Sequence, residues 1–267
     1  MEKIGLIAGN RRFPLIVAQA AARQSVPMVA VGIRGETDPA IKKYVEKLYW
    51  VRLGDFQKVY QVLKADGVEK VIMAGQVSPW RLFSPQFQQS PQIRKLLAGI
   101  KDWRANTIFA ALAAQLESQG FELLDSTTFV KDSLPAKGVL TRTQPDPAMW
   151  EDIRFGTDIA RKVAGLDIGL SVGIRQKAVV AVEALEGTDN LIRRAGSLAR
   201  KGVVIVKVGR PGQDMRFDIP VIGIATIRQL KASRASCMAI EAQRTLVIDL
   251  EACVSLADRC RIALVAV

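Results

Sequence analysis

Short apolar runs alternate with amphipathic segments along the first half of the chain, and this alternation predicts β-α units. The expected strands are Lys3–Ala8, Pro27–Gly32, Lys47–Leu53, Lys70–Ala74 and Phe121–Leu124. The expected helices are Phe13–Arg23, Phe56–Ala65, Gln92–Leu97 and Ala105–Ser118. This order is typical of a mostly parallel sheet with helices packed on its faces. We therefore expect a Rossmann-like α/β domain over residues 1–128.

The pattern weakens between Phe129 and Pro147, where turn-forming Pro, Gly, Asp and Ser residues accumulate. We expect a linker over residues 129–147. Beyond it, a helix is expected over Met149–Ala164, and a hairpin over Leu170–Leu185 with its turn near residues 175–177. Further strand and helix signals follow to the end of the chain. The sequence thus predicts a second, smaller α/β domain over residues 148–267.

The chain contains no histidine, and this absence removes several classes of enzyme. It excludes Ser-His-Asp and Cys-His catalysis, H-E-x-x-H zinc sites and binuclear centres with imidazole ligands. Carboxylates, lysines, arginines, hydroxyls or a hard cation must carry any catalysis.

The charge is strongly positive, with 38 Lys and Arg against 26 Asp and Glu, a formal net charge of +12. A charge of this sign favours anionic partners. The basic residues are spread without a basic run, so charge alone leaves a nucleic acid, a nucleotide and an anionic membrane face open. Nucleic-acid binding has no support beyond charge, and we expect none.

The three cysteines, Cys237, Cys253 and Cys260, have no C-x-x-C spacing and indicate neither a disulfide framework nor a zinc site. No leader-like segment is visible at the N-terminus. No apolar run approaches the roughly 18 residues of a membrane span. The expectation is therefore a cytoplasmic protein that meets lipid only at its surface or in a cleft.

Two glycine-containing turns follow predicted strands of the first half. Gly9 and Asn10 follow the first strand, and Gly75 and Gln76 follow the fourth. If the fourth strand is central, Gly75 and Gln76 would line the same crevice as Gly9 and Asn10, at the carboxyl edge of the sheet, where open α/β folds bind ligands. The G-x-G-x-x-G fingerprint and the Walker A sequence are absent. The alternative interpretation is two ordinary tight turns.

In the second half, Thr188 precedes a predicted short helix over Asn190–Leu198. The free N–H groups and the dipole of such a helix end suit a phosphate, to which Thr188 could donate a further hydrogen bond. The alternative is that Thr188 or Asp189 simply caps the helix.

The most informative segment is Lys207–Pro220, which places Asp214, Asp218 and three cations directly after an apolar strand. Hydrolysis of a diphosphate needs growing negative charge to be neutralised and a water to be held or deprotonated. Lys or Arg together with carboxylate-bound Mg²⁺ can supply both. In an extended strand the two aspartates would lie roughly 13 Å apart, too far to share one ion. One metal ligand and one base or structural residue is therefore the expectation, with a solvated loop as the alternative.

Several segments together resemble the LpxI-type UDP-2,3-diacylglucosamine pyrophosphatases. They are Ile4–Asn10, Arg12–Pro14, Met73–Gly75, Gly120–Asp125, Leu166–Gly169, Val182–Asp189 and Lys207–Pro220. The most specific element is Glu-Gly-Thr-Asp followed by Pro-Gly-Gln-Asp-x-Arg-x-Asp-x-Pro, in this order and distance.

The resemblance implies Mg²⁺-dependent attack of water on the α-phosphorus of UDP-2,3-diacylglucosamine. The products would be UMP and 2,3-diacylglucosamine 1-phosphate (lipid X), an intermediate of lipid A biosynthesis. Carried over by position, the substrate-binding residues are Gly9, Asn10, Gly75, Gln76, Thr188 and Lys207, and the catalytic residues are Asp214 and Asp218, with Asp214 as the metal ligand. A peripheral contact with the inner membrane and the oligomeric state remain open.

The chain also departs from the family pattern. Arg11 stands where the family often has glycine, Gln76 where lysine is common, and Ala105 and Asn106 where paired aspartates are expected. These departures keep a second hypothesis open, a non-catalytic nucleotide-sugar binding or regulatory protein.

Overall fold

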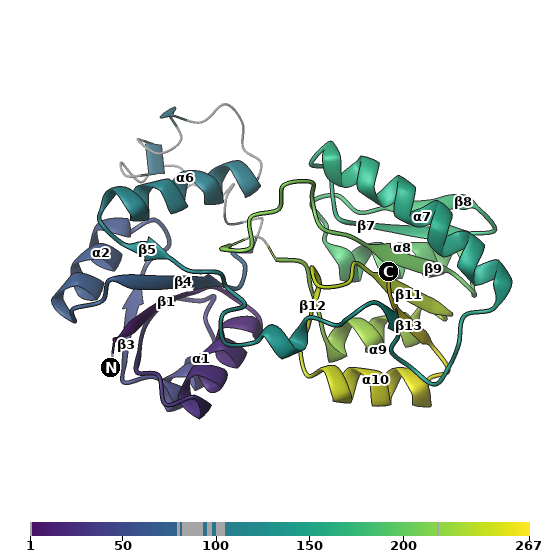
Figure 1. Cartoon of the computed structure of the whole chain (residues 1–267). Coiled ribbons are helices and arrows are strands. Elements are labelled where there is room, and N and C mark those ends of the chain that lie inside the picture. Colours follow the sequence, from purple (N-terminus) through teal and green to yellow (C-terminus); the bar gives the residue numbers. More distant parts are fainter. Residues whose placement is uncertain (1, 79–80, 82–92, 95–97, 100–104, 218) are drawn as a thin grey trace. The chain divides into compact units, whose positions relative to one another are not determined.

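The structure is a computed structural model that describes residues 2–78, 81, 93–94, 98–99, 105–217 and 219–267 (Figure 1). The chain forms two compact units. The first unit comprises Met1–Lys131 together with Asp214–Asp218, and the second comprises Asp132–Gln213 together with Ile219–Val267. Both units are α/β, so the predicted fold class is confirmed.

The first unit contains a five-stranded, fully parallel sheet with the strand order β3-β2-β1-β4-β5. Its strands are β1 (Ile4–Ala8), β2 (Met28–Ile33), β3 (Lys47–Val51), β4 (Lys70–Ala74) and β5 (Glu122–Leu123). This is the order of a Rossmann-like sheet, and it makes the first and fourth strands neighbours.

Helices cover both faces of this sheet, which is why its central strands are apolar throughout rather than alternating. α1 (Phe13–Arg23) lies on one face, whereas α2 (Phe56–Ala65) and α6 (Ala105–Ser118) lie on the other (Figure 1). A short 3₁₀ helix, η1 (Pro39–Tyr44), packs beside α1. Asp55 begins α2 as its N-cap, because its carboxylate accepts a hydrogen bond from the Lys58 N–H. The predicted helix over 92–97 lies mostly outside the described residues.

The second unit contains a six-stranded mixed sheet with the strand order β6-β13-β11-β9-β7-β8. The strands are β6 (Gly138–Val139), β7 (Ser171–Arg175), β8 (Ala178–Val182), β9 (Val204–Lys207), β11 (Cys237–Ile240) and β13 (Ala263–Ala266). β9, β11 and β13 are parallel, whereas β6, β7 and β8 pair antiparallel. A separate two-stranded ladder joins β10 (Val221–Ile222) to β12 (Leu246–Val247).

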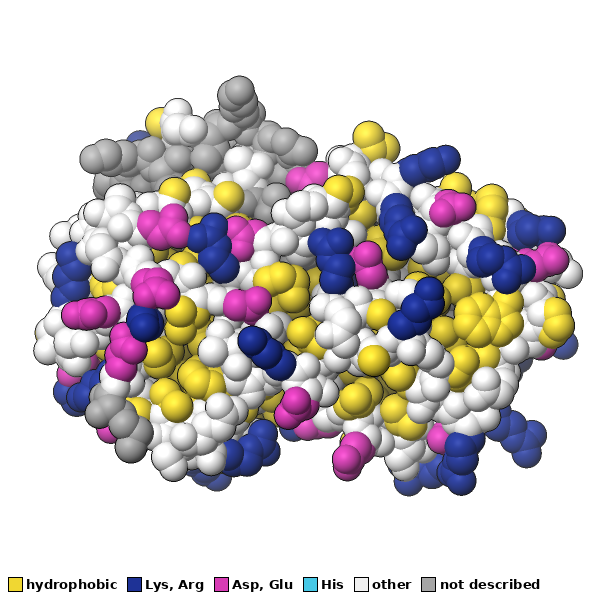
Figure 2. Space-filling view, in the orientation of Figure 1, with side chains coloured by type: hydrophobic (Ala, Val, Ile, Leu, Met, Phe, Trp, Pro, Cys, Tyr) yellow, Lys and Arg dark blue, Asp and Glu magenta, His cyan; other side chains and the backbone are white. Residues whose placement is uncertain are grey.

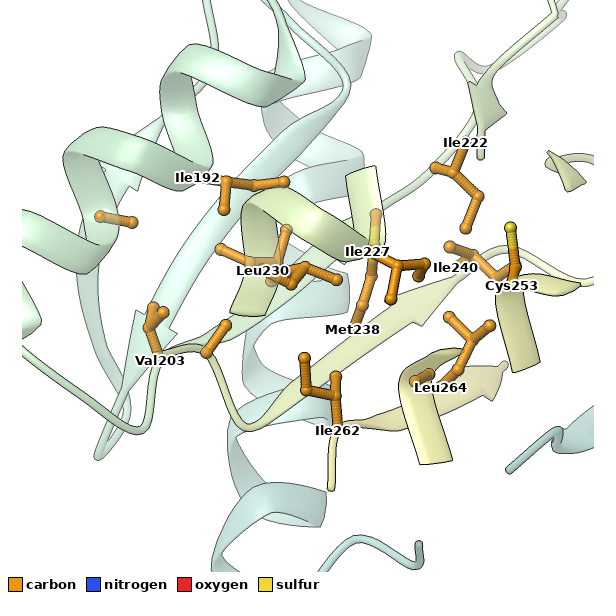
Figure 3. Packing of buried hydrophobic residues seen from close by; sticks show 14 of the residues in the cluster. Ile192, Val203, Ile222, Ile227, Leu230, Met238, Ile240, Cys253, Ile262 and Leu264 are labelled. Atoms are coloured by element: carbon orange, nitrogen blue, oxygen red, sulfur yellow. The ribbon is translucent and has the colours of Figure 1, made fainter. Parts of the chain in front are cut away.

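Two cores form on opposite faces of this second sheet. α7 (Pro147–Gly165) packs on one face against Val204 and Val206. The helices α8 (Thr188–Ala199), α9 (Ile224–Ala232) and α10 (Leu250–Arg259) cover the other face, where Ile205 lies between those two valines in sequence. Figure 3 shows this second core, whose buried residues include Leu230 and Met238. Successive side chains of β9 enter the two cores in turn, because neighbouring residues of a strand point to opposite faces of the sheet.

The predicted hairpin of the second half is present as β7 and β8. Its turn residues Gln176 and Lys177 both have positive φ, at 51° and 58°. The buried carboxylate of Asp152 accepts hydrogen bonds from both of their N–H groups, at 2.9 and 2.6 Å. Asp152 therefore stabilises a turn geometry that residues other than glycine rarely adopt.

The segment expected to be a linker, residues 129–147, contains regular secondary structure. It contains the 3₁₀ helix η2 (Lys131–Ser133) and the edge strand β6, which pairs with β13. From Asp132 onward this stretch is part of the second unit. The segment that begins at Asp214, expected in the second domain, packs in the first unit instead.

Among the described helices, none combines the length and apolar character needed to cross a membrane. All three cysteines are free thiols.

Candidate functional site

The two glycine turns of the first unit meet at the carboxyl edge of its sheet. β1 and β4 pair in parallel, with Ala8 opposite Ala74. The Gly9 N–H then donates to the Ala74 carbonyl at 2.8 Å, and the Asn10 N–H donates to the Gln76 carbonyl at 2.7 Å. The structure therefore brings Gly9, Asn10, Gly75 and Gln76 together.

Close approach of two backbones explains why both turns use glycine. A Cβ on Gly9 would lie 2.4 Å from the Gln76 carbonyl oxygen. A Cβ on Gly75, whose φ is +87°, would lie 2.6 Å from the Asn10 carbonyl oxygen. Each turn thus leaves no room for a side chain on the other. These glycines have a packing role that holds with or without a ligand.

The close approach of the two turns leaves no space for a methyl group at position 9. Gly9→Ala will lower the free energy of unfolding by about 1–3 kcal/mol, because the added methyl group must push two bonded backbones apart. Urea unfolding followed by circular dichroism measures the change. Gly165→Ala is the control: its Cβ would meet no atom closer than 3.9 Å, and we expect a change within about 0.5 kcal/mol. Equal stability of the two variants would contradict the packing role.

The Asn10 side chain belongs to a polar network centred on Glu36, a residue that sequence reasoning missed. Asn10 Nδ2 donates to Glu36 Oε2 at 2.6 Å and to Ser78 Oγ at 3.0 Å. The Ser78 N–H and hydroxyl also donate to Glu36 Oε2, at 3.2 and 3.0 Å, and Arg81 forms an ion pair with the same carboxylate. Only 2% of the Glu36 side chain is exposed. Asn10 therefore helps to hold two loops, whereas Gln76 is exposed to solvent.

The segment from Asp214 to Phe217 packs beside the end of β4. Ser126 Oγ lies 2.6 Å from the carbonyl oxygens of both Met73 and Arg216, and the Ser126 N–H donates to the Met215 carbonyl at 3.0 Å. Phe217 stacks on Phe109 of α6, with 6.3 Å between ring centroids. The segment is therefore fixed next to the strand that leads into Gly75.

The Asp214 carboxylate is held by Arg216 through both of its oxygens. The Arg216 Nε lies 2.9 Å from Oδ1, the Nη2 lies 2.7 Å from Oδ2, and the backbone N–H donates to Oδ1 at 3.0 Å. These bonds lower the pKa of Asp214 below its ordinary value. Because the folded pKa is lowered, the stability from this pair is present above the ordinary carboxyl pKa and is lost as the pH falls through the lowered value. At neutral pH Asp214 is an anion and a weak base.

Arg216 itself has a second acidic partner, Glu117 near the end of α6. These carboxylates raise the pKa of the Arg216 guanidinium, with Asp214 as the largest cause. The other predicted catalytic residue, Asp218, lies outside the described residues.

No group of three His, Cys, Asp or Glu side chains close enough to hold a metal occurs in the part of the chain that the structure describes. A protein cage for a cation is therefore absent from that part. Mg²⁺, however, commonly binds one or two carboxylates and takes its other ligands from water and substrate phosphates. The ionised oxygens of Asp214 fit one such ligand position.

In the second unit, the structure brings Thr188 and Lys207 together with a third residue, Glu183. Lys207 Nζ donates to Thr188 Oγ1 at 2.8 Å, and the Thr188 hydroxyl donates to Glu183 Oε1 at 3.0 Å. Lys207 Nζ also lies 4.0 Å from Glu183 Oε2. Lys207 and Glu183 are only 5% and 7% exposed. Sequence reasoning missed Glu183, although it lies in the family-like segment Val182–Asp189, because a glutamate normally indicates an exposed position.

Neither Thr188 nor Asp189 caps α8, so that alternative is wrong. The N-cap is Gly187, with φ +81°, and it makes no side-chain capping bond. Thr188 is instead the first residue of the helix, and its hydroxyl points to the buried pair. The Lys207–Thr188–Glu183 cluster therefore fixes the N-terminal end of α8 to the end of β9.

These features define a two-unit α/β protein whose first unit carries an ionised aspartate beside the carboxyl edge of a Rossmann-like sheet. Two family models match the chain, one over each half. The LpxI N-terminal domain matches residues 3–133, and the LpxI C-terminal domain matches residues 136–265. The chain belongs to the LpxI family.

A relative of known name supports this assignment. The chain is 31% identical, over 270 residues, to the UDP-2,3-diacylglucosamine pyrophosphatase LpxI of Caulobacter vibrioides. The match covers 97% of this chain and 95% of the relative.

Solved structures give weaker likenesses. The leucoanthocyanidin reductase–NADPH complex from Vitis vinifera is 11% identical with a TM-score of 0.30, over 56% of this chain and 41% of that one. The biotin carboxylase domain of a thermophilic 2-oxoglutarate carboxylase is 13% identical with a TM-score of 0.29, over 65% and 35%. The chain spans less than half the length of either.

Proposed function

We propose that this chain hydrolyses the diphosphate bond of UDP-2,3-diacylglucosamine and releases UMP and 2,3-diacylglucosamine 1-phosphate. This is a step of lipid A biosynthesis. The observation that carries the proposal is the end-to-end match to the LpxI family, which includes a relative named for this reaction. The chemistry agrees with the composition, because phosphoanhydride hydrolysis can proceed with carboxylates and a divalent cation and needs no imidazole.

In this proposal, water attacks the α-phosphorus. A new P–O bond forms from the water oxygen, the bond from the α-phosphorus to the bridging oxygen breaks, and that oxygen leaves with the sugar phosphate. Mg²⁺, when bound, neutralises the negative charge that grows on the phosphoryl oxygens.

Asp214 is the proposed ligand for this cation. Its lowered pKa keeps it anionic, and Arg216 fixes its orientation through both carboxylate oxygens. An anion of low basicity is better suited to holding a cation or orienting a water than to removing a proton. Asp218 is therefore the proposed base.

The other proposed contacts come from both units. In the first unit, Gly9, Asn10, Gly75 and Gln76 form the edge that faces the substrate, and the exposed Gln76 amide is the free polar side chain among them. In the second unit, Thr188 and Lys207 position the N-terminal end of α8, whose N–H groups suit a phosphate. The proposal places the protein in the cytoplasm, with peripheral contact to the inner membrane that holds its lipid-linked substrate.

A product assay tests this function. The purified chain, given UDP-2,3-diacylglucosamine in detergent micelles with Mg²⁺, will release UMP, and chelation by EDTA will stop the release until Mg²⁺ is restored. Chromatography of the nucleotide products measures both effects. Binding of the substrate without any UMP release would instead favour the second hypothesis, a nucleotide-sugar binding protein without catalysis.

The departures from the family pattern supply the reason to keep that second hypothesis. Gln76 replaces a commonly found lysine and removes a positive charge near the proposed diphosphate. Arg11, where glycine is common, adopts φ +63°, a conformation that glycine reaches without strain. Arg11 thus retains the turn that glycine would form, so this departure leaves the backbone of the edge in place.

A further inference from the structure

A polar cavity of about 420 Å³ occurs at the carboxyl ends of β2 and β3 in the first unit. Its lining consists of Arg34, Trp50, Arg52, Asp55 and Lys58. Arg34 and Arg52 directly follow β2 and β3, and Lys58 belongs to the first turn of α2. The proposed hydrolysis uses none of these residues, because its contacts in this sheet are at the ends of β1 and β4.

The register of the sheet places the two arginines side by side. β2 and β3 pair in parallel with Ile33 opposite Val51, and the Arg34 N–H continues the ladder by donating to the Val51 carbonyl at 2.9 Å. Arg34 and Arg52 are therefore the next residues of two adjacent strands, whose backbones in a sheet are roughly 5 Å apart. Like charges at neighbouring positions repel each other. The arrangement becomes favourable when an anion lies between the two guanidinium groups.

The charges of this cavity are not balanced by the carboxylates that the structure describes. Arg34, Arg52 and Lys58 are exposed, and none of them forms an ion pair within the described part of the chain. The one acidic residue of the lining, Asp55, accepts the Lys58 N–H and caps α2. On the face shown in Figure 2, by contrast, Lys and Arg are interspersed with acidic and neutral side chains. Three cations against one carboxylate favour a ligand with more than one negative charge.

A phosphate monoester fits this excess of positive charge. At neutral pH it carries nearly two negative charges and presents three oxygen acceptors. Guanidinium groups bind such oxygens through pairs of parallel hydrogen bonds, and the first N–H groups of α2 also favour an anion. Rossmann-type sheets use an arginine in this region to hold a phosphate monoester of a bound nucleotide. A nucleic acid spreads its charges along a backbone and would need a longer basic surface than this cavity offers.

We propose that this cavity is a second anion site, which binds a small phosphate monoester through Arg34, Arg52 and Lys58. The Trp50 ring forms an apolar wall for the carbon skeleton that carries the phosphate. The ligand is distinct from the diphosphate of the proposed reaction. In the strand order β3-β2-β1-β4, the ends of β2 and β3 are two and three strands from β4, roughly 10 and 14 Å. One phosphate group cannot contact both places.

Calorimetric titration of the full chain with ribose 5-phosphate, at constant ionic strength, tests the site. The decisive variant is Arg34→Gln with Arg52→Gln, which retains two long polar side chains and removes two charges. Lys42→Gln with Lys43→Gln is the matched control, because it removes two exposed charges from η1 in the same unit.

We expect roughly tenfold weaker binding of ribose 5-phosphate in the arginine variant, because two charge-assisted contacts are lost. The lysine control should bind within about twofold of wild type. Equal losses in the two variants, or none in either, would overturn the proposal. So would a wild-type chain that binds neither ribose 5-phosphate nor inorganic phosphate.

Thermal unfolding gives an independent readout, because an anion that binds only the folded chain raises Tm. At low salt without phosphate, the arginine variant should be at least as stable as wild type, since it removes the repulsion between Arg34 and Arg52. Replacing chloride with phosphate at equal ionic strength will raise the Tm of wild type more than that of the variant. A variant less stable than wild type without phosphate would show a structural role for the arginines and contradict the proposal.

The rate of UMP release distinguishes this site from the proposed reaction. We expect kcat and KM for UDP-2,3-diacylglucosamine to stay close to wild type in the arginine variant, because neither arginine belongs to the proposed catalytic edge. A rise in KM that parallels the loss of ribose 5-phosphate binding would place the substrate in the cavity and overturn the proposal of a separate ligand. The calorimetric test holds even if the wild type releases no UMP, since it does not depend on the proposed function.

Cosedimentation with vesicles that contain phosphatidic acid separates a soluble ligand from a bilayer, because the headgroup of this lipid is also a phosphate monoester. We expect wild type and the arginine variant to sediment with the vesicles to the same extent. If only the wild type sediments, and ribose 5-phosphate does not compete, the cations contact a lipid headgroup and the proposal of a small soluble ligand is wrong.

Discussion

Asp214→Asn will lower the rate of UMP release by about 10²–10³-fold, a loss typical of removing one group that stabilises charge in a transition state. Asparagine retains the size of the side chain but not the negative charge that we propose holds the cation. Asparagine also cannot form an ion pair with the guanidinium of Arg216. Initial rates at saturating Mg²⁺ will show the loss chiefly in kcat, and circular dichroism will show whether the fold is retained.

Glu117→Gln is the matched control for that variant. It removes the other acidic partner of Arg216 and leaves the carboxylate of Asp214 in place. The pair is exposed, and exposed ion pairs contribute little to stability, so we expect a rate within about threefold of wild type. Asp218→Asn, assayed in parallel, tests the proposed base. If both aspartate variants release UMP at the wild-type rate, neither Asp214 nor Asp218 has the proposed role in catalysis.

The regular elements of the first unit could be predicted closely from the sequence. α1 and α2 begin and end at the predicted residues, and β1 and β4 differ by at most one residue from the predicted strands. The physical reason is that each signal is local. A strand buried on both faces is a continuous apolar run, and Asp55 marks the start of α2 because its side chain caps that helix.

The packing of the segment from Asp214 in the first unit could not be predicted from local sequence patterns. It depends on Ser126 and Arg216, whose contact joins residues 90 positions apart, and on the stacking of Phe217 on Phe109. The pattern of apolar and polar residues within the segment does not indicate a contact with residues so distant in the sequence. The edge strand β6 is a similar case, because two residues are too few for a pattern and only β13 gives them strand geometry.

The candidate site was predictable as a set of residues but not as a set of contacts. The spacing of Gly9 and Gly75 after two strands indicated turns at one edge, and the pairing of β1 with β4 places them there. Their need for glycine comes from each other's backbone, which a single turn cannot show. Glu36 and Glu183 were missed for a related reason. A buried carboxylate is identified by its partners, and Asn10 and Lys207, which contact Glu36 and Glu183, are 26 and 24 positions away in the sequence.

The second large effect is expected in the second unit, at the buried cluster of Lys207, Thr188 and Glu183. Lys207→Met will lower the free energy of unfolding by about 3–5 kcal/mol, because it leaves the Glu183 carboxylate buried without a cation. Methionine nearly matches the volume of lysine, so the loss measures the missing charge rather than a cavity. Urea unfolding followed by circular dichroism gives the value.

The double variant Lys207→Met with Glu183→Gln distinguishes an unpaired charge from lost packing. Removing both charges will recover more than half of the lost free energy of unfolding. The amide oxygen of glutamine at position 183 can still accept a hydrogen bond from the Thr188 hydroxyl. Lys201→Met, at an exposed position, will change stability by less than about 0.5 kcal/mol. If Lys207→Met is as stable as Lys201→Met, the pair does not hold the N-terminal end of α8. Any fall in UMP release in that variant would then have to come from a direct contact of Lys207 with the substrate.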